Sequence, residues 1–327
     1  MAKLSTDMCS VLTNTAVENL NRRKIFSIVD VLQEDPAKLA SISNLKFNDI
    51  VTLRQTLIAN YSPFPRQGLD AYNELCSQNT IVRSGIQSLD NLLDGGFLTG
   101  NVYEICGLSG SGKSQLCLTV ITNLALQMKS IVHYIDTKMD FSGRRVHSIL
   151  EAKGANEEEI GTTMEKILVS RVHSFHELYS YLYHLKNQLV REPGSVPLIV
   201  IESLPAVFLQ YMGGHNLDSL GLMNCLSSLI KYIAHEQYVS IIVVNLATMW
   251  VEEESAPLSD GDSEIVSAVP HIDVKPVLGK YWTHVPNTRL YIEQHGFGSE
   301  RKISVIKSTH LPVGRHCNVS VMKDGVR

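Results

Sequence analysis

Apolar positions recur every three or four residues in the first sixty residues of the chain, which is the spacing of amphipathic helices. Thr13, Ser27 and Asp35 stand where helix N-caps are expected, and a fourth helix is predicted from Lys46. Asn44, which tolerates a left-handed backbone, allows a tight connection between the third and fourth helices. Helices joined so tightly suggest a helix-hairpin-helix module, which contacts either a nucleic-acid phosphate or another protein. Lys and Arg form only one short cluster there, so docking to a protein is favoured.

Prolines and a glycine between Tyr61 and Gly68 interrupt the helical pattern and predict a linker. The chain is therefore divided into a small all-α, helix-hairpin-helix-like domain at residues 1–60, a linker at 61–80 and a larger domain at 81–327.

Continuous apolar runs alternate with helical patterns in the larger domain. Strands are expected at 101–106, 131–136, 167–169, 198–202 and 240–245, and helices at 86–93, 115–128, 146–153, 175–190 and 217–235. This alternation predicts an α/β fold with a mostly parallel central sheet covered on both faces. Three β patterns between 288 and 321 predict antiparallel C-terminal strands at the sheet edge.

One segment after the first of these strands fits the P-loop pattern GxxxxGK(S/T) without a mismatch. It lies between a β-prone run and a helical pattern, which is the context that this motif requires. Backbone N–H groups and a helix N-terminus would hold the phosphates of ATP, Lys113 would add a positive charge, and the Ser114 hydroxyl would bind Mg²⁺. The residues predicted to bind ATP here are Gly107, Leu108, Ser109, Gly110, Ser111, Gly112, Lys113, Ser114 and Gln115.

A P-loop also needs a carboxylate at the end of a neighbouring strand to hold the magnesium shell. Glu202, which closes the run 198–202, is the candidate, so the predicted metal residues are Ser114 and Glu202. Lys138 follows the strand ending at Asp136, where a group that activates water is expected. A protonated lysine cannot act as that base, and no motif places Asp136 or Asp140 in the role.

Composition adds limits on location and on binding partners. The 29 Lys+Arg and 33 Asp+Glu give a net charge of -4, so no global basic field attracts nucleic acid or membrane. The six cysteines lack CxxC pairs, which suggests buried free thiols in a reducing compartment. Neither a signal-peptide pattern nor a membrane-spanning run is present in the sequence, so an intracellular, soluble protein without a membrane partner is expected.

The order of the motifs resembles the RecA-type recombinases. The matching segments are 84–96, Gly100, the P-loop, 134–136, 202–203, Asn245 and 275–279. The N-terminal helices, followed by Phe64-Pro65 and the segment 72–75, look most like the D group of the eukaryotic recombinase paralogues. The resemblance covers nearly the whole chain.

This resemblance implies a RecA-like ATPase core and a nuclear ATP-binding subunit of a paralogue complex that supports homologous recombination repair of DNA. Other recombinase paralogues would bind through the linker, the N-terminal domain and the ATP-site face, and single-stranded or branched DNA would be bound through the complex. The resemblance also implies that Arg145 contacts the nucleotide and that Leu311-Pro312 caps ATP in a neighbouring subunit.

Two departures from the family pattern affect hydrolysis. Lys138 replaces the catalytic glutamate, so no catalytic residue is assigned, and Leu246 replaces the glutamine that links the γ-phosphate to a DNA loop. Both changes remove polar groups needed for turnover. ATP binding with weak or absent hydrolysis is therefore predicted, and ATP is expected to act mainly in subunit assembly.

The two segments that face DNA in this family also depart from it. Residues 210–216 contain no Lys or Arg. The second segment, roughly 248–273, has no Lys or Arg before Lys275 and carries Glu252, Glu253, Glu254, Asp260, Asp262 and Glu264. Direct binding of single strands is disfavoured, because nonspecific affinity depends on Lys and Arg. Trp250, Tyr281 and Trp282 would either stack on bases or pack in the core, and packing is favoured. Two alternatives stay open, a DNA-stimulated ATPase and a RecA-like regulator outside DNA repair.

Overall fold

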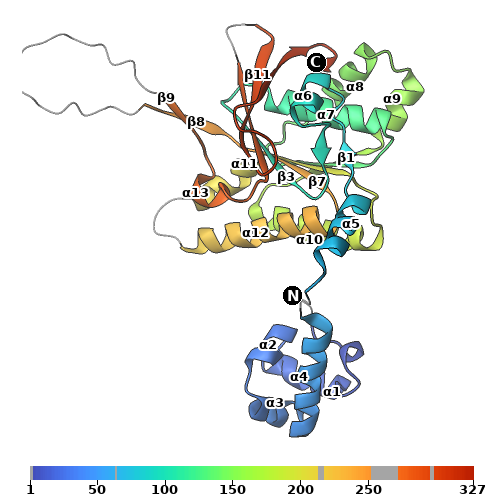
Figure 1. Ribbon diagram of the computed structural model, residues 1–327, viewed down its shortest axis with the longest axis vertical. Helices are drawn as coiled ribbons and strands as arrows, with labels where there is room; N and C mark the ends of the chain where they lie inside the picture. Colours follow the sequence, from blue (N-terminus) through green and yellow to red (C-terminus); the bar gives the residue numbers. More distant parts are fainter. Residues whose placement is uncertain (1–2, 63–64, 213–216, 252–271, 295–297) are drawn as a thin grey trace, which may run out of the picture. The chain divides into compact units, whose positions relative to one another are not determined.

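The computed structural model describes residues 3–62, 65–212, 217–251, 272–294 and 298–327. The chain divides into two compact units, Met1–Glu74 and Leu75–Arg327 (Figure 1). Each unit has its own hydrophobic core. No helix in the described residues is long and apolar enough to cross a membrane.

In the described residues 3–62 of the N-terminal unit, four α-helices follow a short 3-10 turn at Thr6–Met8. They are α1 (Asn14–Arg22), α2 (Ile28–Gln33), α3 (Pro36–Ser43) and α4 (Phe47–Tyr61). The side chains of Thr13, Ser27 and Asp35 accept the expected capping hydrogen bonds, and Asn44 has a left-handed backbone (φ 61°) between α3 and α4. Leu20, Leu39 and other buried apolar residues of these helices meet in one core.

A fifth helix, α5 (Gly68–Gln78), occupies most of the segment predicted to be a linker. Among the described residues of this segment, 62, 65–67 and 79–80 lack helical structure, and Pro63 and Phe64 lie outside the described residues. The helix was not predicted from the sequence because it begins at Gly68, three residues after Pro65, and both residue types normally mark turns. None of its side chains is buried in this chain.

The larger unit contains a nine-stranded sheet, counted over the described residues, in the order β13-β12-β11-β10-β3-β7-β6-β4-β5. The strands from β10 to β5 in that order run parallel, whereas β11, β12 and β13 are antiparallel, which confirms the predicted mostly parallel sheet with antiparallel C-terminal strands. The strands are β3 (Val102–Cys106), β4 (Val132–Asp136), β5 (Ile167–Arg171), β6 (Leu198–Glu202), β7 (Ser240–Val244), β10 (Thr288–Gln294), β11 (Glu300–Ser308), β12 (His316–Met322) and β13 (Gly325–Val326).

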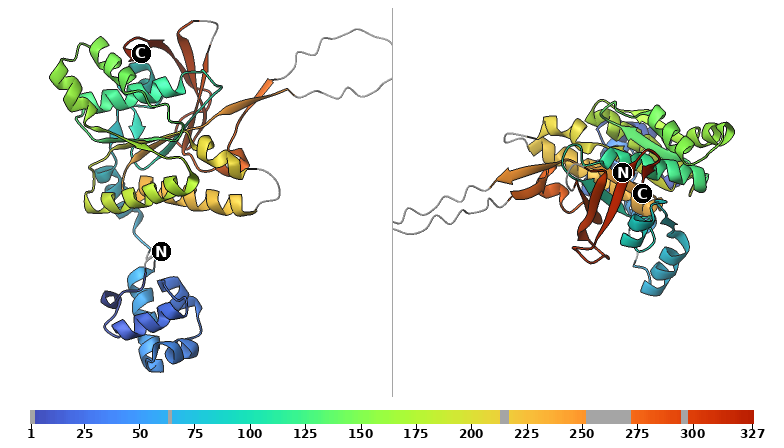
Figure 2. Two further views of the ribbon diagram at one scale, coloured as in Figure 1. Left: turned by 180° about the vertical axis from the view of Figure 1, so that it is seen from behind. Right: turned by 90° about the horizontal axis from the view of Figure 1, so that it is seen from above.

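Helices cover both faces of this sheet (Figures 1 and 2). On β6, Leu198 and Val200 join the core that includes α7 and α8, whereas Ile199 and Ile201 join the core that includes α10 and α12. This two-sided burial explains why the strands are continuous apolar runs. The helices are α6 (Gln87–Leu92), α7 (Lys113–Gln127), α8 (Gly143–Ala152), α9 (Glu157–Met164), α10 (Phe175–Arg191), α11 (Leu204–Phe208), α12 (Leu217–Glu236) and α13 (Gly279–Trp282), and residues 209–211 form a 3-10 turn.

Two small antiparallel ribbons were not predicted from the sequence. One pairs β1 (Ile81–Val82) with β2 (Phe97–Leu98), and the other pairs β8 (Ala247–Val251) with β9 (Ile272–Pro276). The second ribbon corrects the expectation of a loop from 248 to 273, because both ends of that segment are strands. Each strand in these ribbons has five residues or fewer, so a period-2 pattern has little room to show.

Candidate nucleotide-binding site

The predicted P-loop lies at the carboxyl end of β3, which is the edge of a parallel sheet where ligands bind. Gly112, the loop residue just before α7, has a left-handed backbone (φ 102°), and Gly110 has φ 76°. A Cβ on Gly107 would approach the carbonyl oxygen of Ile292 to 2.3 Å, so only glycine fits there. The spacing of the glycines therefore follows from the backbone of this turn.

The N-terminus of α7 is open to an anion. Gly112 has no side chain to cap the helix, and the N–H groups of the first helical turn have no carbonyl partner within the helix. Positive partial charge at this end of the helix favours a phosphate group. The same turn carries Lys113, Ser114 and Gln115, which the sequence predicted to bind ATP.

The Lys113 ammonium is folded back onto the loop. It donates to the carbonyl oxygens of Gly107 (2.9 Å) and Leu108 (2.6 Å). No carboxylate in the described residues lies within ion-pair distance of it, although its residue is only 7% exposed. Burial lowers the pKa of Lys113 below its ordinary value, against the opposing charge of Glu202. A bound anion would supply the charge compensation that this lysine lacks.

Ser114 and Glu202, the two residues predicted to bind Mg²⁺, contact each other. The Ser114 hydroxyl donates to Oε1 of Glu202, which is fully buried at the end of β6. Oε2 of the same carboxylate accepts a hydrogen bond from the Tyr134 hydroxyl at 2.6 Å, which fixes its orientation. Burial and the Glu202 charge raise the pKa of Tyr134, so its proton stays in place. A hydroxyl beside a carboxylate offers the hard oxygen ligands that Mg²⁺ prefers, so these residues fit ATP and Mg²⁺.

Lys138 reaches the same carboxylate. Its Nζ lies 3.0 Å from Oε1 of Glu202 and 2.8 Å from Oδ2 of Asp140. Partial burial disfavours the charged form, but the hydrogen bonds and negative charges of Asp140 and Glu202 outweigh it and raise the pKa of Lys138. The ammonium is therefore protonated and cannot accept a proton from water.

Asp136 is fully buried, and its carboxylate accepts hydrogen bonds from the backbone. Its carboxylate accepts hydrogen bonds from the N–H groups of Lys138 (3.1 Å) and Phe141 (3.0 Å), which holds the turn after β4. The register of β4 and β6 sets Asp136 opposite Glu202. This strand pairing places Lys138, two residues further on, beside the metal residues.

Arg145 points toward the C-terminal strands. Its guanidinium donates to the side chain of Gln115 (2.8 Å) and to the carbonyl oxygens of Met322 and Lys323 (2.7 Å each). Gln115 and Arg145, both predicted to contact ATP, therefore contact each other. These bonds join α7 and α8 to the end of β12, and a contact of Arg145 with the nucleotide stays a prediction.

Asn245 and Leu246 follow β7 and lie next to the P-loop. The Asn245 amide is buried and donates to Glu104 at 2.6 Å, while its oxygen accepts from the Leu246 N–H. The next residue, Ala247, donates its N–H to the carbonyl oxygen of Gly107 at 3.1 Å. Leu246 is thus held close to the loop, but it brings no polar group to it.

The segments expected to face DNA are described only in part. Residues 213–216 and 252–271 lie outside the described residues, and with them the acidic positions from Glu252 to Glu264. The side chain of Trp250 is not described either. Trp282 is fully buried, which rules out stacking on a base and confirms packing for this residue. Tyr281 is 40% exposed, and its hydroxyl donates to Asn224.

Arg301 contacts the P-loop, which the sequence analysis missed. Its Nε donates to the carbonyl oxygen of Ser111 at 3.0 Å, and its side chain lies beside Gly112. It comes from β11, 190 residues further along the chain. No local motif marks this arginine, because only the pairing of β10 with both β3 and β11 places it here.

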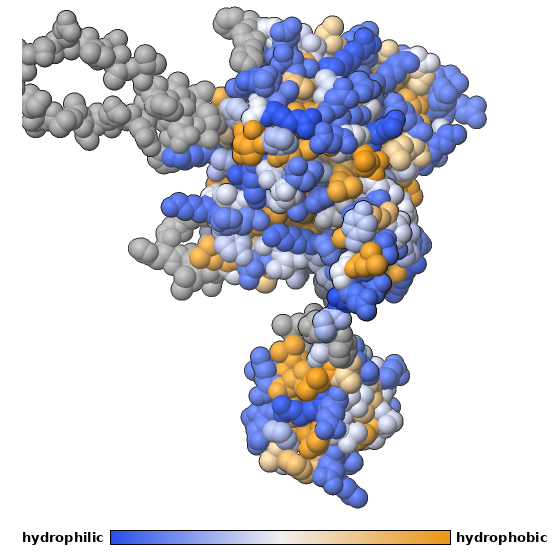
Figure 3. Space-filling model, viewed as in Figure 1, coloured by the Kyte–Doolittle hydropathy of each residue, from blue (hydrophilic) through white to orange (hydrophobic). Residues whose placement is uncertain are grey.

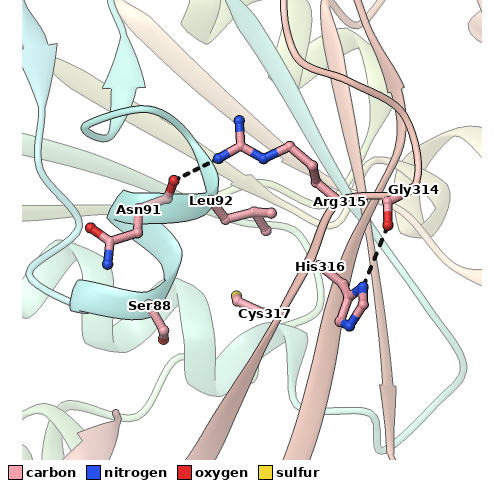
Figure 4. A pocket seen from close by; sticks show the side chains of 7 residues that line it. All are labelled: Ser88, Asn91, Leu92, Gly314, Arg315, His316 and Cys317. Atoms are coloured by element: carbon pink, nitrogen blue, oxygen red, sulfur yellow. Dashed lines mark hydrogen bonds between the residues drawn. The ribbon is translucent and has the colours of Figure 1, made fainter.

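The segment predicted to cap a neighbour's ATP lies beside an open pocket. Leu311 is buried in the core, whereas Pro312 and Val313 are exposed. The pocket has a volume of about 630 Å³ and lies between α6 and the start of β12 (Figure 4). Arg315 crosses it to donate to the carbonyl oxygen of Asn91 at 3.0 Å. Its lining residues are Ser88, Asn91, Leu92, Gly314, Arg315, His316 and Cys317.

The cysteines are all free thiols, but not all are buried as expected. Cys9, Cys106 and Cys117 are buried, whereas Cys76 and Cys225 are exposed. No cluster of three metal-ligating His, Cys, Asp or Glu side chains occurs in the part of the chain that the structure describes.

Comparison with known proteins identifies both parts of the chain. The family model described as Rad51 matches residues 77–327, and the model described as "RAD51D, N-terminal domain" matches residues 1–60. These matches confirm the resemblance to the eukaryotic recombinase paralogues and to their D group.

Individual proteins similar to this chain support the same family. DNA repair protein RAD51 homolog 4 from Bos taurus is 33% identical over 96% of this chain and 93% of its own length, and the protein of that name from Mus musculus is 32% identical over the same shares. DNA repair protein RAD51 homolog 2 from Homo sapiens is 24% identical over 92% of this chain and 83% of its own length. Among solved structures, the RadB recombinase has the same fold, with a TM-score of 0.59 and 21% identity over 75% of this chain and 98% of that one.

Proposed function

This chain belongs to the Rad51 family, and we propose that it is an ATP-binding recombinase paralogue that supports homologous recombination repair of DNA within a complex of paralogues. In this role ATP acts mainly in the assembly of subunits, and hydrolysis is slow or absent. The names of the relatives, which are DNA repair proteins, support the biological role and a nuclear location.

One observation carries this proposal. The buried carboxylate of Glu202 contacts the P-loop hydroxyl of Ser114 on one side and the Lys138 ammonium on the other. The first contact is what a site for ATP and Mg²⁺ needs. The second fills the position of a water-activating base with a group that carries no free lone pair. Binding and hydrolysis are therefore separable in this site.

Exposed apolar side chains support partner binding. The N-terminal unit exposes Phe26, Phe47 and Ile58 at 48–53%, and Figure 3 shows orange patches on its surface. In α5, Leu69 is 68% exposed. These residues give the N-terminal domain and the linker helix apolar contacts for other paralogues. Pro312 and Val313 are exposed in the turn between β11 and β12, at the sheet edge opposite the P-loop. The face that carries the ATP site is the third surface proposed for these partners. DNA is then contacted through the assembled complex.

The experiment that tests the proposal is a titration of the purified chain with labelled ATP and Mg²⁺, followed by a measurement of phosphate release over hours with and without single-stranded DNA. We expect binding without DNA-stimulated turnover. Robust stimulated hydrolysis would favour the alternative, a DNA-stimulated ATPase that acts directly on single strands. Failure to bind ATP would contradict both functions.

The assembly role has its own test. Lys113→Ala should abolish nucleotide-dependent association with the recombinase paralogues of the same organism while the N-terminal helices stay folded, as measured by co-purification and circular dichroism. Lys129→Ala, at an exposed position near the far end of α7, is the matched control. Equal recovery of partners with both variants would contradict a role of ATP in assembly.

A further inference from the structure

The carboxylate predicted to serve the metal already has a cation beside it. Lys138 Nζ lies 3.0 Å from Oε1 of Glu202, and this is the oxygen that also accepts the Ser114 hydroxyl proton. In the described residues, the Lys138 ammonium therefore contacts two carboxylates. One is the buried carboxylate of Glu202, and the other is that of Asp140, at 2.8 Å.

This cation is fixed in place from several directions. The turn that carries Lys138 is held by backbone hydrogen bonds to the buried Asp136 carboxylate. Thr137, the residue before it, donates its N–H to the Glu202 carbonyl oxygen at 2.8 Å, and its hydroxyl donates to the Ser203 carbonyl oxygen at 2.7 Å. The lysine side chain is 32% exposed, so it also reaches the open side of the site.

The charge balance of the site follows from these contacts. Lys113 and Lys138 carry two positive charges, and Glu202 and Asp140 carry two negative ones. A glutamate at position 138 would change this balance from zero to minus two. A site with that balance would repel a triphosphate strongly unless a divalent cation were bound, whereas the neutral site does not.

We propose that Lys138 is a built-in monovalent cation of the nucleotide site, which lets this chain bind a nucleoside triphosphate with only a weak requirement for Mg²⁺. This inference rests on the proposed ATP binding and adds a property to it. The ammonium neutralises Glu202 before nucleotide arrives, and afterwards it remains beside the phosphates and provides part of the positive charge otherwise provided by the metal. The same ammonium takes the place of a catalytic base, so weak metal dependence and weak hydrolysis have one cause.

The test measures ATP affinity by equilibrium titration with a fluorescent ATP analogue, in Mg²⁺ and in EDTA. For the unmodified chain, EDTA should weaken binding by less than about threefold. For Lys138→Met, which keeps most of the length but removes the charge, we expect a loss of about tenfold, and for Lys138→Glu about a hundredfold. Lys129→Glu makes the same charge change at an exposed site near the far end of α7 and should behave like the unmodified chain.

A second measurement needs no nucleotide. Without ATP, Mg²⁺ alone should leave the melting temperature of the unmodified chain unchanged, but it should raise that of Lys138→Met, in which the buried Glu202 has lost its cation. Absence of ATP binding in Mg²⁺ would overturn the proposed function together with this inference. Binding in Mg²⁺ that EDTA weakens equally in the unmodified chain and in both Lys138 variants would overturn this inference alone.

Discussion

The two corners of the nucleotide site differ in what they retain. At the P-loop corner, the glycine backbone, Lys113 and the contact of Ser114 with Glu202 bring together all the groups predicted to hold phosphate and Mg²⁺. At the corner formed by the ends of β4 and β7, Lys138 and Leu246 stand where polar groups for hydrolysis are needed. Both corners lie on the same edge of the same sheet. The difference shows that this fold can keep the groups predicted for binding while the positions predicted for hydrolysis hold other residues.

The largest effect is expected at the binding corner. Lys113→Ala removes the only ammonium that the P-loop itself supplies to the phosphates. Hydrogen bonds to charged groups are worth up to about 3 kcal/mol, which corresponds to a weakening of ATP binding of up to about a hundredfold. Titration with a fluorescent ATP analogue measures this. Lys129→Ala should bind as the unmodified chain does. An affinity loss below about threefold for Lys113→Ala would mean that the P-loop does not hold the triphosphate.

The next largest effect is expected when polar groups are restored at the hydrolysis corner. The double change Lys138→Glu with Leu246→Gln restores both polar groups and should raise ATP turnover at least about tenfold over the unmodified chain. Each single change should raise it less, because a base and a γ-phosphate contact act as a unit. Phosphate release in the presence of single-stranded DNA and Mg²⁺ measures turnover. If the double variant binds ATP but shows no gain, the comparison must extend to Glu202 or to a group from a neighbouring subunit.

A smaller effect is expected at Arg145, which the sequence assigned to the nucleotide. In the structure its guanidinium donates hydrogen bonds to the Gln115 side chain and to two carbonyl oxygens near the end of β12. Arg145→Ala should therefore lower stability by about 1–2 kcal/mol, a fall in melting temperature of about 2–8 °C, and change ATP affinity less than about threefold. Arg144→Ala, at the exposed neighbouring position, is the control. A strong loss of affinity with unchanged melting temperature would place Arg145 in the binding corner.

The sequence predicted the binding corner better than the hydrolysis corner. The P-loop is contiguous, and Glu202 ends an apolar strand, so both are visible in short windows. The contact of Lys138 with Glu202 joins residues 64 positions apart and depends on the pairing of β4 with β6. The contact of Arg301 on β11 with Ser111 likewise joins distant residues and depends on strand pairing. These contacts were missed because strand order, unlike strand position, leaves no local pattern.

The smallest predicted effect involves β4, which ends two residues before Lys138 and carries Tyr134, the residue that orients Glu202. His133 on this strand is buried, and burial lowers its pKa below the ordinary value, so the folded state resists protonation. The unfolded chain accepts that proton near pH 6.5, and the stability that neutral His133 provides is therefore lost as the pH falls below about 6.5. Between pH 7.5 and 5.5 the unmodified chain should lose up to about 1 kcal/mol more than His133→Gln, or about 2–4 °C in melting temperature. Because the strand is shared, ATP binding and any turnover should fall together at pH 5.5. A fall in ATP binding without a fall in turnover, or the reverse, would contradict this prediction. The pH dependence of the two corners would then come from groups other than His133.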